Sequence, residues 1–547
     1  METELFHDTK RDLLVYKTAD PDRIVGAIAG SRRINGHIVA VPRTLYNSQL
    51  CRWLDLPVPP VMGSYDWPHR PGITPLAHQK LMANFMVLHP RCFNLSDMGT
   101  MKTLSTLWAA DWVMQQYPKG TCRALIVAPL SILQRVWGDA IFANFLRRRT
   151  FSIVHGSAEK RAEQLAKDAD FYIINFDGVG VGAHTRKDFA LDGLSKQLAE
   201  RTDIQICVVD EASGYRDSRT KRHRIARLVI GKRNYLWFLT GTPTPNYPTD
   251  AYGLAKLVNN AFGQSFRTFQ AKSMVRLTQF KWVPARDGYE QARALLQPAI
   301  RFDIKDIWDG PPLTTQQREV PLTKEQSDHM TALKRDFVIK VKSGATIDAV
   351  NEASVRTKFI QISLGQVYDA EHKAHTIDSY PRLQELQDIV DNSNGKIIVF
   401  VPLTSVIDML NIRFKEIRSR ALKNGNQAEH DRYTCEVVNG AVSQKERARI
   451  FSAFQSAGDP RVLIADPGTT AHGLDLWQAQ TVVFYGPTDK TELYLQAIKR
   501  AHRPGQRYPV TVVQLVSNKL EREIFARLER NESMQGLLLD LVKNDTF

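Results

Sequence analysis

The sequence lacks the long apolar runs and the cysteine patterns that mark membrane proteins and disulfide-bonded scaffolds. None of its 547 residues belongs to an unbroken apolar run of about 18, so no membrane span is predicted. Its five cysteines are scattered, odd in number and without CxxC spacing. This pattern argues against a disulfide framework and against a zinc site, and it favours a reducing compartment.

The first residues also lack the basic and apolar regions of a signal peptide, since they read Met1-Glu2-Thr3-Glu4. We therefore expect a cytoplasmic protein, in the nucleoid or in the host cytoplasm if the chain is viral, and a nuclear one if it is eukaryotic.

Acidic residues are too few to balance the basic ones. The chain has 73 Lys and Arg against 58 Asp and Glu, a net charge of +15. Such a surplus favours binding to polyanions, because neutralised phosphates supply affinity that does not depend on sequence. The length predicts more than one domain, and 43% hydrophobic residues are ordinary for a soluble globular protein.

The segment from Gln496 to Gln506 reads QAIKRAHRPGQ. It places Arg500 and Arg503 three residues apart at the end of a predicted helix, which Pro504-Gly505 would stop. Two fixed guanidinium groups suit the neutralisation of charge on a phosphate during transfer. The spacing alone is more typical of a solvated helix face.

A candidate phosphate loop lies at Leu95 to Thr103, LSDMGTMKT. Lys102 could reach terminal phosphates, Thr103 could hold magnesium through its hydroxyl, and Gly99 could turn a backbone N–H inward. The strict pattern has glycine where this chain has Met101. Glycine is favoured there because the turn tends to need a positive φ, so an altered loop and a non-functional one both stay open.

Asp210-Glu211 follows the apolar run Ile204 to Val209, which is short enough to be a buried parallel strand. Carboxylates at the C-terminal end of such a strand face the crevice where α/β proteins bind ligands. A second strand, Tyr235 to Phe238, is followed by the string Leu239-Thr240-Gly241-Thr242-Pro243.

The ordered set of strings, from about residue 74 to 510, resembles the Swi/Snf-type branch of the superfamily-two helicases and translocases. QAIKRAHRPGQ resembles the last helicase motif of that branch. The resemblance implies an α/β fold with two tandem RecA-like parallel-sheet domains, helical insertions and a small N-terminal α+β module. The family often has histidine where this chain has Ser213, which puts a coupling contact in doubt.

The resemblance also implies ATP and magnesium as cofactors, with ATP between the two domains. Gln79 would read adenine, Asp210 and Thr103 would hold magnesium, and Glu211 would activate water. Arg503 would be the arginine finger, supported by Arg500. The expected catalytic residues are Lys102, Asp210, Glu211, Arg500 and Arg503, and the expected nucleotide-binding residues are Gln79, Gly99, Thr100, Met101, Lys102, Thr103, Gly473 and Asp475.

Further strings match the family's nucleic-acid elements. The residues expected to contact nucleic acid are Pro129, Ser131, His155, Asn175, Arg219, Arg222 and Gln444. Arg219 and Arg222 belong to a basic cluster that also contains Arg216, Lys221, Arg224 and Arg227 and that is equally compatible with a solvated helix face. Arg147-Arg148-Arg149 is the weaker basic string.

Four segments are predicted. Residues 1–68 form an accessory module, loosely similar to the HARP-type module of annealing helicases, with a strand pair at Ile24 to Ile28 and Ile38 to Val41, and with Arg32 and Arg33 in the turn between them. Residues 69–325 are predicted to form the first motor domain with a helical protrusion, and residues 326–380 are predicted to form a helical linker. Residues 381–547 are predicted to form the second motor domain, which ends in a helix from Glu521 to Val542.

The resulting hypothesis is a DNA-dependent ATPase that moves along double-stranded or forked DNA without sequence preference, as a monomer with no membrane contact, in fork remodelling, strand annealing, protein displacement or DNA repair. Two alternatives stay open: a strand-separating helicase, and a DNA-binding protein with a degenerate ATP site.

Overall fold

The structure is a computed structural model that describes residues 3–183, 190–277, 282–342, 349–369, 371, 373–470 and 476–530. The chain forms two compact units, Met1–Ile307 and Trp308–Phe547. We predicted the first motor domain to extend to residue 325, whereas the first unit ends at Ile307, because the strand that follows joins the sheet of the second unit. No helix in the described ranges is both long and apolar enough to cross a membrane.

The centre of the first unit is a seven-stranded sheet in the order β13-β5-β10-β9-β6-β8-β7, and every neighbouring pair is parallel. Its strands are β5 (Arg91–Asn94), β6 (Arg123–Ala128), β7 (Phe151–Val154), β8 (Phe171–Asn175), β9 (Ile204–Asp210), β10 (Tyr235–Leu239) and β13 (Ala299–Ile300). Leu125 and Val127 pack into one hydrophobic core, and Ile126 packs into another on the opposite face. A sheet buried on both faces requires helices on both sides.

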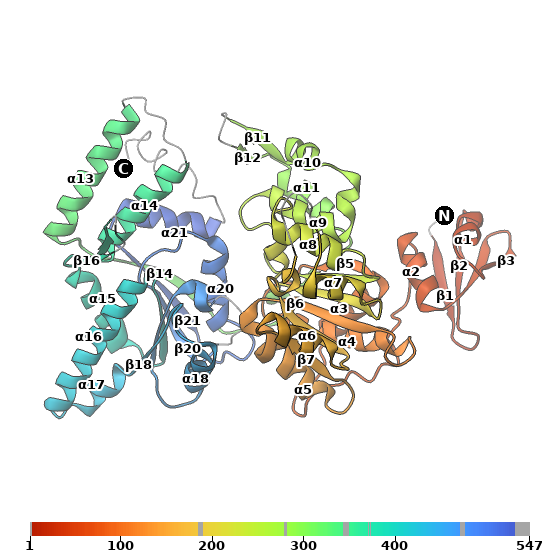
Figure 1. Ribbon diagram of the computed structural model, residues 1–547, viewed down its shortest axis with the longest axis horizontal. Helices are drawn as coiled ribbons and strands as arrows, with labels where there is room; N and C mark the ends of the chain where they lie inside the picture. Colours follow the sequence, from red (N-terminus) through yellow and green to blue (C-terminus); the bar gives the residue numbers. More distant parts are fainter. Residues whose placement is uncertain are drawn as a thin grey trace. The chain divides into compact units, whose positions relative to one another are not determined.

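Helices cover this sheet, and a small hairpin lies beside α10 (Figure 1). The α-helices of the first unit after its N-terminal module are α3 (Ala77–Leu88), α4 (Lys102–Gln115), α5 (Asp139–Phe145), α6 (Ala158–Ala166), α7 (Gly193–Glu200), α8 (Lys221–Val229), α9 (Ala251–Val258), α10 (Phe266–Ser273), α11 (Gly288–Leu295) and α12 (Ile304–Ile307). Short turns are η1 (Leu130–Ile132), η2 (Leu133–Gly138), η3 (Gly178–Gly180), η4 (Ala212–Tyr215), η5 (Pro248–Asp250) and η6 (Asn260–Gly263), and the hairpin is β11 (Met274–Arg276) with β12 (Trp282–Pro284).

The N-terminal module is an antiparallel sheet in the order β1-β2-β4-β3. Its elements are β1 (Glu4–Asp8), β2 (Leu13–Lys17), α1 (Pro21–Ala27), β3 (Arg32–Asn35), β4 (Ile38–Pro42) and α2 (Leu45–Trp53). The predicted strand from Ile24 to Ile28 is wrong, because Asp20 accepts the N–H of Arg23 and Pro21 begins a helix there. Arg32 and Arg33 lie on strand β3, not in a turn.

The segment that follows this module is tied to the motor by buried contacts. Met62 is fully buried in the core beneath α3 and α4, and its N–H donates to Asn84. The Tyr65 hydroxyl donates to Asp111, 2.6 Å away. Arg148 and Arg149 each place a guanidinium nitrogen 2.6 Å from the same buried carboxylate. Two of the three arginines in Arg147-Arg148-Arg149 therefore pair with a structural aspartate.

The second unit contains a six-stranded parallel sheet in the order β14-β21-β20-β17-β19-β18. Its strands are β14 (Leu313–Glu319), β17 (Lys396–Phe400), β18 (Cys435–Val438), β19 (Val462–Ala465), β20 (Ala479–Phe484) and β21 (Val510–Val516). The other elements are α13 (Lys324–Lys342), α14 (Ala349–Ser363), β15 (Gln366–Tyr368), β16 (Ala374–Thr376), α15 (Tyr380–Asn392), α16 (Thr404–Lys423), α17 (Gln427–Arg432), α18 (Gln444–Gln455), α19 (Pro467–Thr470), α20 (Thr491–Ala501) and α21 (Lys519–Arg530). The rest of the predicted helix to Val542 lies outside the described residues.

A buried ion pair joins α15 to α21 in the second unit. Arg382 and Glu521 are each 1% exposed and lie 2.6 Å apart. The guanidinium also donates to the carbonyl of Tyr485 and the hydroxyl of Ser517. Two parallel-sheet domains and a small N-terminal α+β module confirm the predicted fold class.

Candidate nucleotide and nucleic-acid site

The predicted phosphate loop connects strand β5 to helix α4, which begins at Lys102. Gly99 has φ 86°, and Met101 has φ 60° and ψ 39°, both in the left-handed region. The backbone at residue 101 therefore has the positive φ that favours glycine, and methionine adopts it at a cost of about 1 kcal/mol.

Lys102 lies against the carbonyls of its own loop. Its Nζ donates to the carbonyl oxygens of Ser96, at 2.6 Å, and Asp97, at 2.8 Å. Thr100 is fully buried, and its carbonyl lies 3.2 Å from the Nε2 of His78. Thr103 follows in the first turn of α4, where unpaired N–H groups and the helix dipole favour an anion.

Gln79 lies in the first turn of α3 and is 1% exposed. Its Oε1 accepts the N–H of Leu76 at 3.0 Å, which fixes the orientation of the amide. Its Nε2 is buried and has no hydrogen-bond partner in the part of the chain that the structure describes. An unpaired buried donor is costly, and a ligand acceptor, such as a purine nitrogen, would satisfy it.

Three neighbouring strands bring the loop and the acidic pair to one edge. Asn94 of β5, Leu239 of β10 and Asp210 of β9 lie in register. The loop and Asp210 are therefore two strand spacings apart, ~10 Å. The turn between them touches the loop: Thr240 N–H donates to the Asn94 carbonyl, and a Cβ on Gly241 would come within 3.3 Å of the Met98 nitrogen.

Asp210 is oriented by two donors. The indole Nε1 of Trp137 donates to its Oδ2 at 3.0 Å, and the N–H of Glu211 donates to its Oδ1 at 3.0 Å. Trp137 is fully buried and lies on η2, which follows η1, the turn that contains Ser131. Sequence reasoning missed Trp137, because nothing in the spacing of this tryptophan points to a carboxylate 73 residues away.

The other half of the same edge carries the predicted nucleic-acid residues. Pro129 follows β6, His155 follows β7 and Asn175 ends β8, and these three strands are neighbours. Arg161 donates to Asn175 Oδ1 at 3.1 Å and lies 3.4 Å from His155 Nδ1. Burial, and then the charge of Arg161, lowers the pKa of His155. The structure thus brings His155 and Asn175 together around one buried arginine.

The basic cluster after the acidic pair divides into two kinds of side chain. Arg219 lies 3.1 Å from Asp217, and Arg222 lies 2.6 Å from Asp177. These two predicted nucleic-acid residues therefore each have a carboxylate partner. Arg224 and Arg227 have no ion pair within the described ranges.

In the second unit, the predicted arginines flank the end of a helix. Arg500 is in the last turn of α20, whereas Arg503 lies two residues beyond its end at Ala501. The helix therefore stops before Pro504. The Nε2 of Gln506 donates to the carbonyls of Ala479 and Ala501 and so fixes the turn that follows the helix.

The remaining predicted residues of the second unit are Gln444, Gly473 and Asp475. Gln444 is exposed at the start of α18. Gly473 and Asp475 lie outside the described residues.

The predicted metal ligands have the right donor chemistry. Asp210 supplies a carboxylate and Thr103 a hydroxyl, and magnesium prefers oxygen ligands, typically one or two protein carboxylates together with substrate phosphates. The two residues fit such an ion, because a carboxylate has about four lone-pair sites and can accept hydrogen bonds while it holds a metal.

Comparisons with known proteins identify two domain families and several relatives. Residues 78–369 match the SNF2-related domain, and residues 381–505 match the helicase conserved C-terminal domain. Protein p41 of Acyrthosiphon pisum secondary endosymbiont phage 1 is 24% identical over 86% of this chain and 99% of its own length. The human DNA annealing helicase and endonuclease ZRANB3 is 21% identical over 82% of this chain, which spans only 39% of ZRANB3. A Sulfolobus solfataricus SWI2/SNF2 ATPase core in complex with dsDNA is 21% identical, with coverage of 88% and 95% and a TM-score of 0.38.

Proposed function

This chain belongs to the SNF2-related domain family, and on that premise we propose that it couples ATP hydrolysis to movement along duplex DNA. One observation carries the proposal: the phosphate loop, the Thr240–Thr242 turn and Asp210 lie at one edge of a parallel sheet, beside the residues expected to contact DNA.

Each residue has a defined role in this proposal. Lys102 and the N-terminus of α4 bind the terminal phosphates of ATP, and Gln79 binds the adenine. Asp210 and Thr103 hold magnesium, which supplies charge neutralisation when bound. Glu211 orients the attacking water, and Arg500 and Arg503 stabilise charge on the transferred phosphoryl group.

Contact with DNA is assigned to the other half of the edge. Pro129, Ser131, His155 and Asn175, with Gln444 of the second unit, would contact the phosphate backbone. The backbone carries no sequence information, so we expect binding without sequence preference and with strong salt dependence. The net charge of +15 supports this assignment.

The finer expectations are part of the same proposal. They are preference for double-stranded or forked DNA, a monomeric state, a division into an accessory module, two motor domains and a helical linker, and a HARP-like role for the N-terminal module. Similarity to a phage protein supports a location in the cytoplasm of a bacterial host.

The decisive experiment is ATP hydrolysis measured with single-stranded, duplex and forked DNA. We expect stimulation by duplex DNA and its loss in Lys102→Ala. Lys232→Ala, at an exposed lysine that precedes β10, is the control and keeps the parent rate. Absence of stimulation in the parent, or an unchanged rate in Lys102→Ala, would refute the proposal.

Met101 favours a second candidate, a DNA-binding protein whose ATP site is degenerate, because a side chain at φ 60° strains the phosphate loop. Duplex binding without measurable ATP hydrolysis would support that candidate. A strand-separating helicase would instead release a labelled strand from forked DNA in the presence of ATP.

A further inference from the structure

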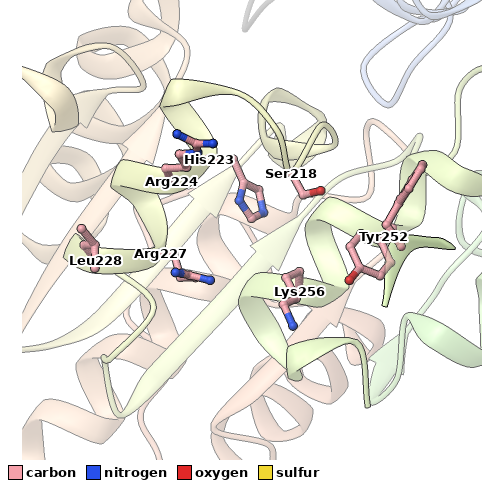
Figure 2. A pocket seen from close by; sticks show the side chains of 8 residues that line it. Ser218, His223, Arg224, Arg227, Leu228, Tyr252 and Lys256 are labelled. Carbon is pink, nitrogen blue, oxygen red and sulfur yellow. The ribbon is translucent and has the colours of Figure 1, made fainter. Parts of the chain in front are cut away.

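A cavity of about 570 Å³ opens between α8 and α9 of the first unit. Two of its lining residues, Arg224 and Arg227, belong to the basic cluster, and none of the residues expected to contact nucleic acid lines it. Its walls include Ser218, Arg224, Arg227, Tyr252, Lys256 and Phe266. Helix α8 supplies the arginines from one side, and α9 supplies the tyrosine and the lysine from the other (Figure 2).

Three positive side chains share this cavity. Arg224 and Arg227 lie one helical turn apart, and Lys256 lies on the neighbouring helix. Within the described ranges none of the three has a carboxylate within ion-pair distance, in contrast to Arg219 and Arg222 of the same basic cluster. Burial lowers the pKa of His223, and the charges of Arg227 and Lys256 add to this effect, while the Gly253 carbonyl and Asp217 oppose it. Both cations therefore lie close enough to act on the same imidazole.

Like charges at this spacing repel one another, by a modest amount because Arg224 and Arg227 are exposed to water. An anion placed among the three cations would offset that repulsion. Arginine is well suited to the task, since its planar fork donates two parallel hydrogen bonds to a phosphate.

The remaining wall of the cavity is apolar and firmly packed. The rings of Tyr252 and Phe266 meet edge to face with centroids 5.3 Å apart. The Tyr252 hydroxyl is already used, since it donates to the carbonyl of Gln264 at 3.0 Å. Tyr252 is only 6% exposed, so the rings form a rigid wall, and the cations are the groups that a phosphate-bearing ligand would meet.

We propose that this cavity binds the phosphodiester backbone of nucleic acid, as a contact additional to those of the strand-end residues. The cavity chemistry selects a phosphate-bearing ligand, and the choice of a nucleic-acid chain rests on the proposed function. The site would add phosphate contacts, and therefore affinity and salt dependence, without base specificity.

The test compares two double variants of the full chain, each of which removes two positive charges. Arg224→Gln/Arg227→Gln removes both guanidinium groups from one wall of the cavity. Lys119→Gln/Lys232→Gln is the control, because both lysines are exposed and precede strands β6 and β10 at the opposite edge of the sheet. The dissociation constant of a labelled 20-base-pair duplex is measured by fluorescence anisotropy over a series of salt concentrations.

We expect the slope of log Kd against log salt to become shallower by about 1 to 2 in the cavity variant, because each phosphate that is no longer neutralised reduces the slope by ~0.9. The control should retain the parent slope. Thermal unfolding without DNA should show the cavity variant at least as stable as the parent, since removal of like charges relieves repulsion. Equal slopes in the two variants would overturn the proposal.

Failure of the proposed function would look different, because the parent chain would then show no DNA-stimulated ATP hydrolysis. A further measurement covers a small phosphorylated ligand. If inorganic pyrophosphate raises the melting temperature of the parent but not of the cavity variant, while both bind duplex with the same slope, the cavity holds a free phosphate compound and not a nucleic-acid backbone.

Discussion

The indole Nε1 of Trp137 donates a hydrogen bond to the Oδ2 of Asp210 at 3.0 Å. Trp137 comes from the segment that follows β6 in the nucleic-acid half of the sheet edge, and Asp210 ends β9 in the nucleotide half. One side chain therefore connects the two halves, and it fixes the orientation of the carboxylate that we assign to magnesium.

Replacing Trp137 by phenylalanine should weaken the use of magnesium. The variant keeps an aromatic ring but loses the donor, and loss of a partner that orients a metal ligand costs about 10-fold or more in metal affinity or activity. We expect the magnesium concentration for half-maximal ATP hydrolysis to rise by about that factor. Trp108→Phe is the matched control, because that buried indole donates at 2.7 Å to the Pro68 carbonyl. If ATP hydrolysis by the two variants depended on magnesium concentration in the same way, Trp137 would not orient the carboxylate that holds the metal.

Replacing Met101 by glycine should raise ATP hydrolysis. Glycine adopts φ 60° freely, so relief of about 1 kcal/mol of strain would favour the phosphate-binding form of the loop by roughly 5-fold in kcat/KM. Met101→Ala separates the two causes, since alanine removes the long side chain but keeps the Cβ. An equal gain with alanine would mean that bulk, and not backbone strain, limits the loop.

Removing Arg382 should destabilise the second unit severely. Arg382→Met leaves Glu521 buried without its counter-ion, a change that typically costs ~3–5 kcal/mol of unfolding free energy. Arg522→Met breaks a surface pair with Glu319 and should cost less than about 1 kcal/mol. Urea unfolding of the two variants measures the difference, and similar losses would show that burial of the pair is unimportant.

The stability of the first unit should fall as the solution is acidified. Burial lowers the pKa of His223, whose Nε2 lies 2.9 Å from the Gly253 carbonyl. Below the ordinary histidine pKa of about 6.5, the unfolded chain takes up a proton that the folded chain does not, so the free energy of unfolding decreases. His223→Gln should flatten this dependence between pH 7 and pH 5, measured by thermal unfolding. His37→Gln, at an exposed position of the N-terminal module, should leave it unchanged.

The sequence could predict elements whose residues carry a local signal. The apolar runs Ile204 to Val209 and Tyr235 to Phe238 indicated buried parallel strands, because such strands are hydrophobic on both faces. Strand β14 carries no such signal in its composition, because its residues Leu313–Glu319 are polar and mostly exposed. That strand forms because β21 offers a sheet edge.

Two local signals competed at the first helix of the N-terminal module. Asp20-Pro21 begins a helix that the apolar residues Ile24 to Ile28 made us predict as a strand, so capping outweighed composition there. Trp137 could not be found from sequence, since its function depends on a contact between distant segments. The positive φ at Met101 was predictable, because the phosphate-loop pattern itself demands it.

The anchoring of Met62 and Tyr65 decides where the chain could be cut to isolate the motor. A shortened protein that begins at residue 69 would lose both side chains, and with them a filled space in the core and the hydroxyl bound to Asp111. The segment around these residues belongs physically to the motor, although it precedes every motif. A cut directly ahead of Met62 would keep both side chains but would remove Leu45 and Val61, which pack against the same core, and Gln49, which donates to the Val87 carbonyl. Helix α2 therefore also supports the motor.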